Sequence, residues 1–232
     1  MKNIAIIPAR IGSKRIPKKN IKNFLGKPII SYPIEAALKS KIFDEVIVST
    51  DSKEVQEISK NLGANSPKLR PKNLSDDFTP TAPVLDHALK HLASIDLSKI
   101  DFLCCIYPTS VFVTSNKLKE AFKKIKHSKS GSCFGVIEND HPIMRSQRIN
   151  EKGHLELIWP EHELTRSQDL EKTFRDSGQF YFLNCKRFLY EKKIYYEDSL
   201  PITLTKYEAH DIDTIDDWAF SEFLYKQLSR NK

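Results

Sequence analysis

Residues with the chemistry of phosphate binding gather in one short segment, Pro8–Asn20, which reads PARIGSKRIPKKN. The segment follows a short apolar run typical of a buried strand, so its backbone N–H groups can face a ligand at the end of that strand. Gly12 lets the backbone approach a ligand closely, and Ser13 adds a hydroxyl group. Arg10 and Lys19 can neutralise phosphate charge, and arginine can do so through two parallel hydrogen bonds. The segment therefore predicts a site for a nucleoside triphosphate.

The spacing within this segment differs from two well-known nucleotide-binding loops. The Walker pattern G-x-x-x-x-G-K-[ST] is absent, and so is the dinucleotide fingerprint G-x-G-x-x-G. Neither a kinase nor a dinucleotide-binding enzyme is therefore favoured.

Positive charge is concentrated around the same segment. Residues 1–30 contain eight lysines and arginines and no acidic residue. The whole chain has a formal net charge of +7, so the rest of it is close to neutral. A patch beside one loop suits a compact anion better than a long polyanion. A basic nucleic-acid-binding module is the alternative from another class, but the chain does not interleave aromatic residues with a basic surface as such modules do.

Two carboxylates near the end of the chain could bind a metal ion. Asp211 and Asp213 alternate on a short segment that we expect to be extended, so both side chains should point to the same face. Carboxylate pairs suit Mg²⁺, which prefers oxygen ligands. The segment ends where a helix is expected to begin, so the carboxylates could instead cap that helix. Asp51 has a similar ambiguity, because it could cap the next helix or serve the nucleotide or metal.

Alternating strand and helix patterns must position these residues. Strands are expected at Ile4–Ile7, Glu45–Ser49, around Leu69, and at Phe102–Tyr107, Ser132–Ile137 and Gln179–Asn184. Helices are expected at Ser31–Ser40, from Asp51 to Gly63, and at Thr81–Ala93, Ser115–Lys126 and from Thr214 onward. This alternation predicts an α/β fold with a mostly parallel sheet and helices on both faces. Ligands bind at the carboxyl ends of such strands, so the loops expected to share one rim are 8–20, 50–51, 70–81, 107–114 and 211–214.

The alternation lapses between residues 141 and 173, a polar stretch with scattered apolar residues that is long for a loop. We expect one domain over residues 1–232, from which residues 141–173 form an excursion that packs against a second subunit. A mobile surface flap is the alternative interpretation.

Composition limits the remaining possibilities. No run approaches the ~20 apolar residues of a membrane-spanning helix, and no signal-peptide pattern is present, so we expect a cytoplasmic protein without a membrane partner. The four cysteines lack metal-type spacing and are expected to be buried thiols.

Beyond these patterns, the chain resembles the CMP-nonulosonic acid synthetases, cytidylyltransferases that activate nine-carbon acidic sugars. This family includes the CMP-sialic acid synthetases and pseudaminic acid cytidylyltransferase. The resemblance starts at Ala9 with A-R-x-G-S-K-R-I-P-x-K-N and runs essentially from end to end. Further motifs follow in the family's order: FLGKP at Phe24–Pro28, VSTD at Val48–Asp51, LRP at Leu69–Pro71 followed by Leu74, Asp76 and Asp77, FRDSGQFYF at Phe174–Phe182, and HDIDT at His210–Thr214.

The resemblance implies a Rossmann-like nucleotide-diphospho-sugar transferase fold. From the excursion at residues 141–173 we expect a homodimer. The resemblance also implies that CTP reacts with the anomeric hydroxyl of a keto-sugar acid, releasing pyrophosphate, without any role for nucleic acid. The nucleotide-binding residues that it implies are Ala9, Arg10, Gly12, Ser13, Lys19, Asn20 and Arg70. Among these, Arg10 and Lys19 would also act in catalysis with Asp211, and Asp211 and Asp213 would hold Mg²⁺.

One position departs from the sialic acid enzymes and bears on the sugar. Their fourth strand ends in glutamine followed by P-T-S-P, whereas this chain has Tyr107 before Pro108, Thr109, Ser110 and Val111. Tyrosine has an apolar body and one hydroxyl, which suits a sugar with fewer hydroxyls and more methyl groups.

We therefore expect pseudaminic acid rather than sialic acid, with legionaminic and 3-deoxy-octulosonic acid as further alternatives. Tyr107 and Thr109 are expected to bind the sugar. Arg175 could meet the sugar carboxylate or form an ion pair at the base of the excursion. Such sugars decorate cell-surface polysaccharide or flagellin, which implies a role in glycan biosynthesis.

Overall fold

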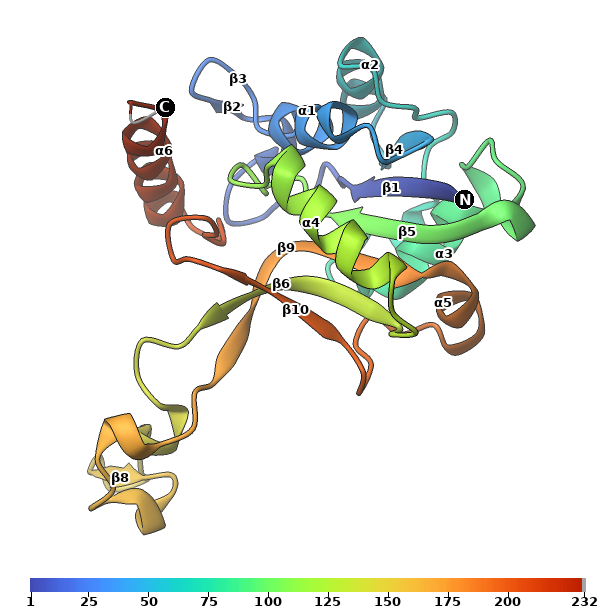
Figure 1. Cartoon of the computed structure of the whole chain (residues 1–232). Helices are drawn as coiled ribbons and strands as arrows, with labels where there is room; N and C mark the ends of the chain where they lie inside the picture. The colour runs from blue at the N-terminus through green and yellow to red at the C-terminus, as the bar shows by residue number, and fades with distance from the viewer. Residues whose placement is uncertain (231–232) are drawn as a thin grey trace.

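A central sheet of six strands forms the frame of the computed structural model, which describes residues 1–230 (Figure 1). The strands are β1 (Lys2–Pro8), β4 (Glu45–Ser49), β5 (Ile100–Ile106), β6 (Ser132–Glu138), β9 (Phe174–Asn184) and β10 (Leu200–Leu204). Their order across the sheet is β10-β6-β9-β5-β1-β4. Strand β9 runs antiparallel to both of its neighbours, and every other pairing is parallel. The expected α/β fold with a mostly parallel sheet is confirmed.

Helices cover both faces of this sheet. They are α1 (Ser31–Ser40), α2 (Lys53–Asn61), α3 (Thr81–His91), α4 (Ser115–Lys126), α5 (Cys185–Glu191) and α6 (Ile215–Arg230). Buried side chains alternate along β1, since Ala5 and Ile7 pack with α1 and α4, while Ile4 and Ile6 pack with α3 and α5. A strand buried on both faces reads as an unbroken apolar run, which is the pattern that the sequence shows there. Short 3₁₀ helices lie at Lys19–Ile21, Lys72–Leu74, Leu97–Lys99, Ile143–Arg145, Pro160–His162 and Ser167–Asp169.

Side-chain caps mark the starts of α2 and α6, with one change from the expected residue. The Ser52 hydroxyl, and not the Asp51 carboxylate, accepts the Val55 N–H at the start of α2. At α6 the Thr214 N–H donates to the Asp217 carboxylate, and the Asp217 N–H donates to the Thr214 hydroxyl. This reciprocal pair confirms the expected start of the last helix.

The strand expected around Leu69 is wrong. In this segment Asn65 alone pairs with the edge strand β4: its N–H donates to the Val46 carbonyl, and its carbonyl accepts the Val48 N–H. Pro67 follows and has no N–H to continue the ladder. The chain then returns to the end of β4 as a loop.

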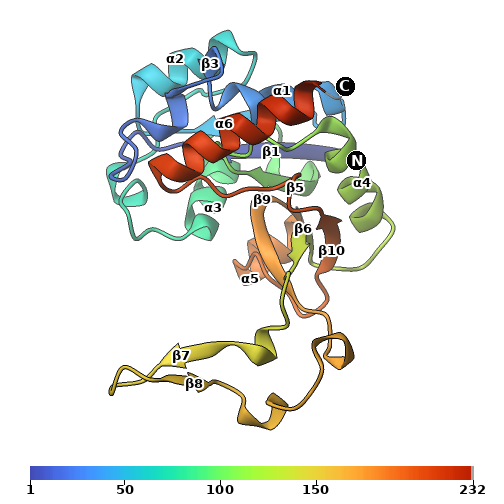
Figure 2. The same ribbon diagram turned by 90° about the vertical axis from the view of Figure 1, so that its left-hand side faces the viewer.

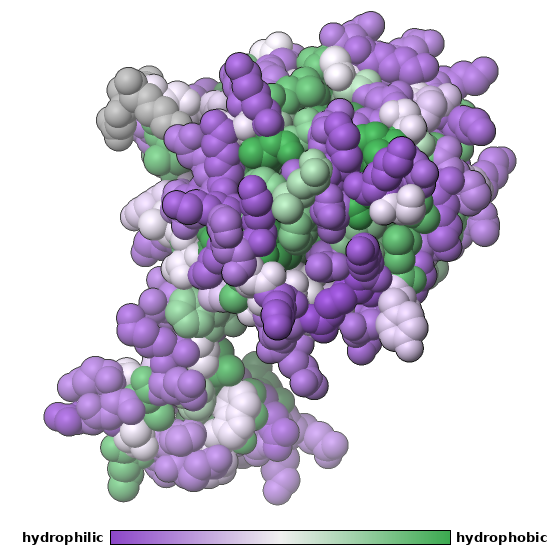
Figure 3. All heavy atoms as spheres, turned by 45° about the vertical axis from the view of Figure 1, so that its right-hand side comes forward, coloured by the Kyte–Doolittle hydropathy of each residue, from purple (hydrophilic) through white to green (hydrophobic). Residues whose placement is uncertain are grey.

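Residues 141–173 leave the body between β6 and β9 and project from it (Figures 1 and 2). They contain an antiparallel hairpin of β7 (Gln147–Ile149) and β8 (Leu155–Leu157). A second small hairpin, β2 (Asn23–Phe24) with β3 (Lys27–Pro28), lies in the body. Apolar residues are exposed on the projecting segment, with 73% exposure at Ile149, 69% at Leu155 and 94% at Leu164. Figure 3 shows green hydrophobic spheres among purple ones on this lobe.

All four cysteines are buried and free, as expected, and burial raises the pKa of each thiol. Within residues 1–230, none of the helices combines the length and apolar character that a membrane crossing needs.

Candidate functional site

Contacts between distant segments bring the predicted rim loops together. The Ile11 N–H donates to the Asp51 carboxylate over 2.9 Å, which joins the loops after β1 and β4. The Lys19 ammonium donates to the Ile212 carbonyl over 2.6 Å, which joins the first loop to the segment before α6. The predicted rim loops therefore meet at the carboxyl ends of the parallel strands, where ligands bind in folds of this class.

The loop after β1 is fixed by a backbone bond to β4 and by the side chain of Asn20. Ala9 is fully buried, and its N–H donates to the Ser49 carbonyl over 2.9 Å, extending the ladder between β1 and β4. The Asn20 side-chain amide donates to the Arg10 carbonyl over 2.8 Å. Gly12 faces open space, because a Cβ built there would meet only a guanidinium nitrogen of Arg10, at 4.0 Å. The loop therefore leaves room for a ligand beside Gly12.

The positive charge of this loop is balanced by acids from other parts of the chain. Arg10 and Lys14 pair with Asp77, Lys18 with Glu54, and Arg15 and Lys19 with Asp213. Residues 1–30 contain no acid, so each of these cations pairs with a carboxylate from a distant part of the chain. Three of these five cations meet carboxylates at 2.5 to 2.7 Å.

A cavity of about 290 Å³ opens beside the loop. Four residues predicted as ligand contacts line it, namely Arg10, Asn20, Arg70 and Tyr107. It is also lined by Asp76, Asp77 and Thr81. Lys19 and Asp213 are in contact with each other, and neither they nor Asp211 belong to the lining of this cavity.

Arg70 lies almost fully buried in the wall of the cavity, at 4% exposure. Its Nε donates to the Ser75 hydroxyl over 3.1 Å. Burial lowers the pKa of the Arg70 guanidinium, and the negative charge of Asp51 opposes that effect. An arginine stays charged in proteins, so Arg70 offers a fixed cation to an anionic or polar ligand.

The two candidate metal ligands have different surroundings. Asp213 accepts from the Lys19 ammonium at 3.2 Å and pairs with Arg15 at 2.9 Å. Asp211 keeps contact with solvent, yet shielding by the atoms around it and the charge of Asp213 raise the pKa of its carboxyl. The charge of Asp213 thus acts on the Asp211 carboxyl.

Tyr107 lines the cavity where β5 ends. Its hydroxyl lies 3.0 Å from the Thr81 hydroxyl at the start of α3, and its ring meets the Tyr181 ring edge-on at 5.5 Å. Burial raises the pKa of Tyr107 to about 12, so the phenol is protonated at neutral pH. The Tyr107 ring therefore adds an aromatic surface to a cavity whose lining is otherwise mainly polar.

Sequence reasoning missed a carboxylate near this ring. The Asp176 carboxylate accepts hydrogen bonds from the hydroxyls of Tyr181, at 2.7 Å, and Tyr195, at 2.6 Å. It also accepts the Gly178 N–H at 2.9 Å. Asp176 and Tyr181 lie within the FRDSGQFYF motif, but Tyr195 comes from a loop whose approach no local pattern reveals.

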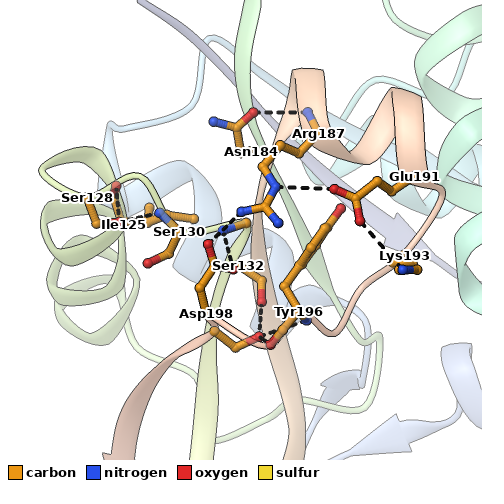
Figure 4. Close-up of polar contacts among 12 residues, drawn as sticks. Ile125, Ser128, Ser130, Ser132, Asn184, Arg187, Glu191, Lys193, Tyr196 and Asp198 are labelled. Carbon is orange, nitrogen blue, oxygen red and sulfur yellow. Dashed lines mark hydrogen bonds and ion pairs between the residues drawn. The ribbon is translucent and has the colours of Figure 1, made fainter.

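A polar network fixes the loop that carries Tyr195 (Figure 4). The Arg187 guanidinium pairs with Asp198 at 2.6 Å and lies over the Tyr196 ring at 4.5 Å. The Asp198 carboxylate also accepts the Gly131 N–H at 3.1 Å, which ties the loop to the start of β6. Tyr195 and Tyr196 therefore point in opposite directions. Tyr196 packs against Arg187 in this network, and Tyr195 hydrogen-bonds to Asp176.

Eight predicted residues do not line the cavity. Five of them are described above, namely Ala9, Gly12, Lys19, Asp211 and Asp213, and three remain. Thr109 is buried in the turn after β5, where its carbonyl accepts the Val111 N–H. Arg175 is exposed and lies opposite Ile137 where β9 leaves the sheet. Ser13 is half-buried on the loop after β1.

Comparison with known proteins gives this arrangement a family. A family model described as cytidylyltransferase matches residues 4–227. The chain is 43% identical over 226 residues to the pseudaminic acid cytidylyltransferase of Campylobacter jejuni subsp. jejuni serotype O:2, covering 97% of each. It is 33% identical over 232 residues to the CMP-N,N'-diacetyllegionaminic acid synthase of Legionella pneumophila subsp. pneumophila, covering 97% of this chain and 96% of that one.

A solved structure agrees on the fold. The structure of CMP:2-keto-3-deoxy-manno-octonic acid synthetase complexed with CTP matches with a TM-score of 0.72 and 15% identity, over 98% of this chain and 99% of that one. The sequence matches confirm the resemblance found in the motifs. The chain therefore belongs to the cytidylyltransferase family and is a nucleotidyltransferase.

Proposed function

We propose that this cytidylyltransferase joins CTP to the anomeric hydroxyl of pseudaminic acid, giving CMP-pseudaminic acid and pyrophosphate. The observation that carries the sugar assignment is the 43% identity, over 97% of both chains, to a pseudaminic acid cytidylyltransferase. The Tyr107 ring supports it, because it adds an aromatic surface to a cavity with a mainly polar lining, and pseudaminic acid is deoxygenated at its tail. Legionaminic acid is the second candidate, supported by the relative with 33% identity.

The proposed reaction is one displacement at the α-phosphorus of CTP. The sugar oxygen forms the new P–O bond as the bond to pyrophosphate breaks, and the hydroxyl proton is released. We place the reaction in the cytoplasm, where CTP is available, and before the transfer of the sugar to a cell-surface glycan or flagellin.

Positioning and charge neutralisation are the tasks of the chain in this reaction. Arg10 and Lys19 would offset negative charge on the phosphates, where it increases as pyrophosphate leaves. The exposed backbone at Gly12 and the Ser13 hydroxyl would contact phosphate oxygens. Arg70 would hold the nucleotide from the cavity wall, since its buried guanidinium has little freedom to move.

Asp211 and Asp213 fit a magnesium ion, because their carboxylates are the hard oxygen donors that Mg²⁺ prefers. Among residues 1–230 no group of three or more histidine, cysteine or acidic side chains forms a cage for a metal. Mg²⁺ often takes only one or two carboxylates, with water and substrate phosphates completing its shell. When bound, it would supply Lewis-acid stabilisation of phosphate charge. Lys19 holds the Asp213 carboxylate beside the phosphate loop through its 3.2 Å contact.

Pyrophosphate release tests the proposed function directly. The purified chain would be incubated with CTP, UTP or ATP and with pseudaminic, legionaminic, sialic or 3-deoxy-octulosonic acid. We expect the highest kcat/KM for the pair of CTP and pseudaminic acid. A higher kcat/KM with another acid would identify that acid as the substrate instead. No pyrophosphate release with CTP and any of these acids would refute the proposed function.

Asp211→Ala tests the metal assignment. We expect loss of magnesium-dependent turnover with an unchanged melting temperature, because the Asp211 side chain is exposed and, within residues 1–230, receives no hydrogen bond from another side chain. Asp216→Ala is the matched control, since Asp216 is an exposed acid a few residues away in the first turn of α6. Activity of Asp211→Ala at the wild-type level would show that Asp211 is not a ligand of the metal.

We also propose that residues 141–173 join two copies of the chain into a homodimer. The exposed apolar side chains of Ile149, Leu155 and Leu164 support this, because a small lobe gains little stability from leaving such residues in water. Light scattering should show a dimer for the wild type and a monomer for Leu155→Asp. Tyr190→Asp, at an 89% exposed position on α5, should remain dimeric. A monomeric wild type would contradict the proposal.

A further inference from the structure

Asp77 holds two cations beside the cavity. One carboxylate oxygen lies 2.5 Å from an Arg10 guanidinium nitrogen, and the other lies 2.5 Å from the Lys14 ammonium. Asp77 and Arg10 line the same cavity of about 290 Å³. The two oxygens therefore satisfy cations that would otherwise bind an incoming anion.

The neighbouring residues hold Asp77 in this place. The Asp76 carboxylate accepts the N–H groups of Phe78, at 2.9 Å, and Thr79, at 2.7 Å. It accepts the Thr79 hydroxyl as well, at 2.7 Å. These three bonds close a local turn, so Asp77 is presented toward the phosphate loop by a turn that is already formed.

We propose that Asp77 is a specificity-determining residue that acts as an internal anion: it occupies Arg10 and Lys14 in the nucleotide-free enzyme, and a polyphosphate must displace it to bind. The inference rests on the proposed function, because it takes Arg10 as a phosphate ligand. The exchange discriminates by charge, since a triphosphate can replace a carboxylate on two cations better than a ligand with little charge can. When pyrophosphate leaves, Asp77 returns to the cations and assists release.

Removing the charge of Asp77 should strengthen the binding of polyphosphates. Asp77→Asn keeps the size of the side chain and one oxygen acceptor, but it leaves Arg10 and Lys14 without their carboxylate. We expect the Kd of CTP and of inorganic tripolyphosphate to fall about two- to tenfold, the range given by one or two exposed ion pairs. The Kd of cytidine, which has no phosphate, should not change.

The salt dependence of binding distinguishes this role from a merely structural one. In the wild type, phosphate replaces a carboxylate on the same cations, so few solution anions are released. In Asp77→Asn those cations attract chloride, which is released when phosphate binds. The slope of log Kd against log salt concentration should therefore be steeper for Asp77→Asn.

The experiment is calorimetric titration of CTP, tripolyphosphate and cytidine into the full chain, with EDTA and at several salt concentrations. Asp86→Asn is the matched control, because the Asp86 carboxylate also pairs with two lysines, Lys90 at 2.8 Å and Lys192 at 2.5 Å, away from the cavity. In turnover assays, pyrophosphate should inhibit Asp77→Asn at lower concentrations than it inhibits the wild type.

The outcomes separate the two proposals. Wild-type protein that binds no CTP even with magnesium would refute the proposed function. Normal CTP binding by the wild type, with an equal or higher Kd in Asp77→Asn, would overturn the internal-anion role alone. We expect the same changes in Kd and salt dependence for Asp77→Ala, which can be measured instead if Asp77→Asn does not fold.

Discussion

The Asp51 carboxylate accepts the Ile11 N–H over 2.9 Å, and so links two loops that are 40 residues apart in the chain. The link exists because β1 and β4 are adjacent and parallel, which brings their carboxyl ends together. Ser52 caps the following helix, so Asp51 is free for this contact. Asp51 also acts electrostatically on Arg70. One carboxylate therefore supports both the phosphate loop and the buried cation of the cavity.

Asp51→Ala should weaken CTP binding without unfolding the chain. Hydrogen bonds to charged groups contribute about 1.5–3 kcal/mol, so the KM for CTP should rise about tenfold or more. Asp51→Asn keeps an acceptor for Ile11 and should have a smaller effect. Steady-state kinetics of pyrophosphate release measure both variants, with melting temperatures as the check on folding. An equal KM in Asp51→Ala and wild type would show that the link does not position the loop.

Gly12→Ala should affect the ligand and leave the free protein unchanged. A Cβ at Gly12 meets one atom, a nitrogen of the Arg10 side chain at 4.0 Å, so there is no clash to relieve. If the loop backbone approaches phosphate at Gly12, the added methyl should raise the Kd of CTP by about tenfold or more. Calorimetry and thermal melting measure the two quantities separately. A Kd for CTP in Gly12→Ala equal to that of the wild type would show that the phosphates do not bind against Gly12.

Local patterns predicted the parallel part of the fold well. The bounds expected for α1, β4 and α4 agree with the structure to the residue, because each is an apolar pattern bounded by polar residues. Strand β10 escaped prediction, since Pro201 and exposed polar residues dilute its short apolar pattern at the edge of the sheet. The direction of β9 depends on pairing with β5 and β6, which no local pattern encodes.

The candidate site was predictable as a set of loops, but not as a set of contacts. The basic loop and the carboxylate pair were evident, since their residues lie close in sequence. The partner of Arg10 was not, because Asp77 is 67 residues away and its motif reads equally well as a turn. Asp176 was missed for the same reason: its partner Tyr195 arrives on a separate loop.

Asp198→Asn should destabilise the protein in a pH-dependent way. Hydrogen bonds from the Gly131 N–H and the Arg187 guanidinium lower the pKa of the Asp198 carboxyl below its value in the unfolded chain, about 3.9. A lowered folded-state pKa adds stability above the unfolded pKa, and that stability is lost as pH falls through the folded pKa. The melting temperature of Asp198→Asn should therefore lie below that of the wild type at pH 7, and the difference should shrink below about pH 4. A constant difference from pH 7 to pH 3 would show that the charge of Asp198 is not involved.

Tyr107→Gln should change the choice of sugar more than the use of CTP. The substitution exchanges an aromatic wall, which packs on Tyr181 at 5.5 Å, for a polar amide. Apolar contacts with a sugar tail would be lost, while a more hydroxylated sugar would gain a hydrogen-bonding partner, so the kcat/KM ratio of pseudaminic to sialic acid should fall about tenfold or more. Tyr107→Phe keeps the ring and loses only the hydroxyl beside Thr81, so its ratio should stay near that of the wild type. Competition between the two acids, with the KM for CTP measured in parallel, decides the matter. An unchanged ratio in Tyr107→Gln would show that the sugar is selected at another wall of the site.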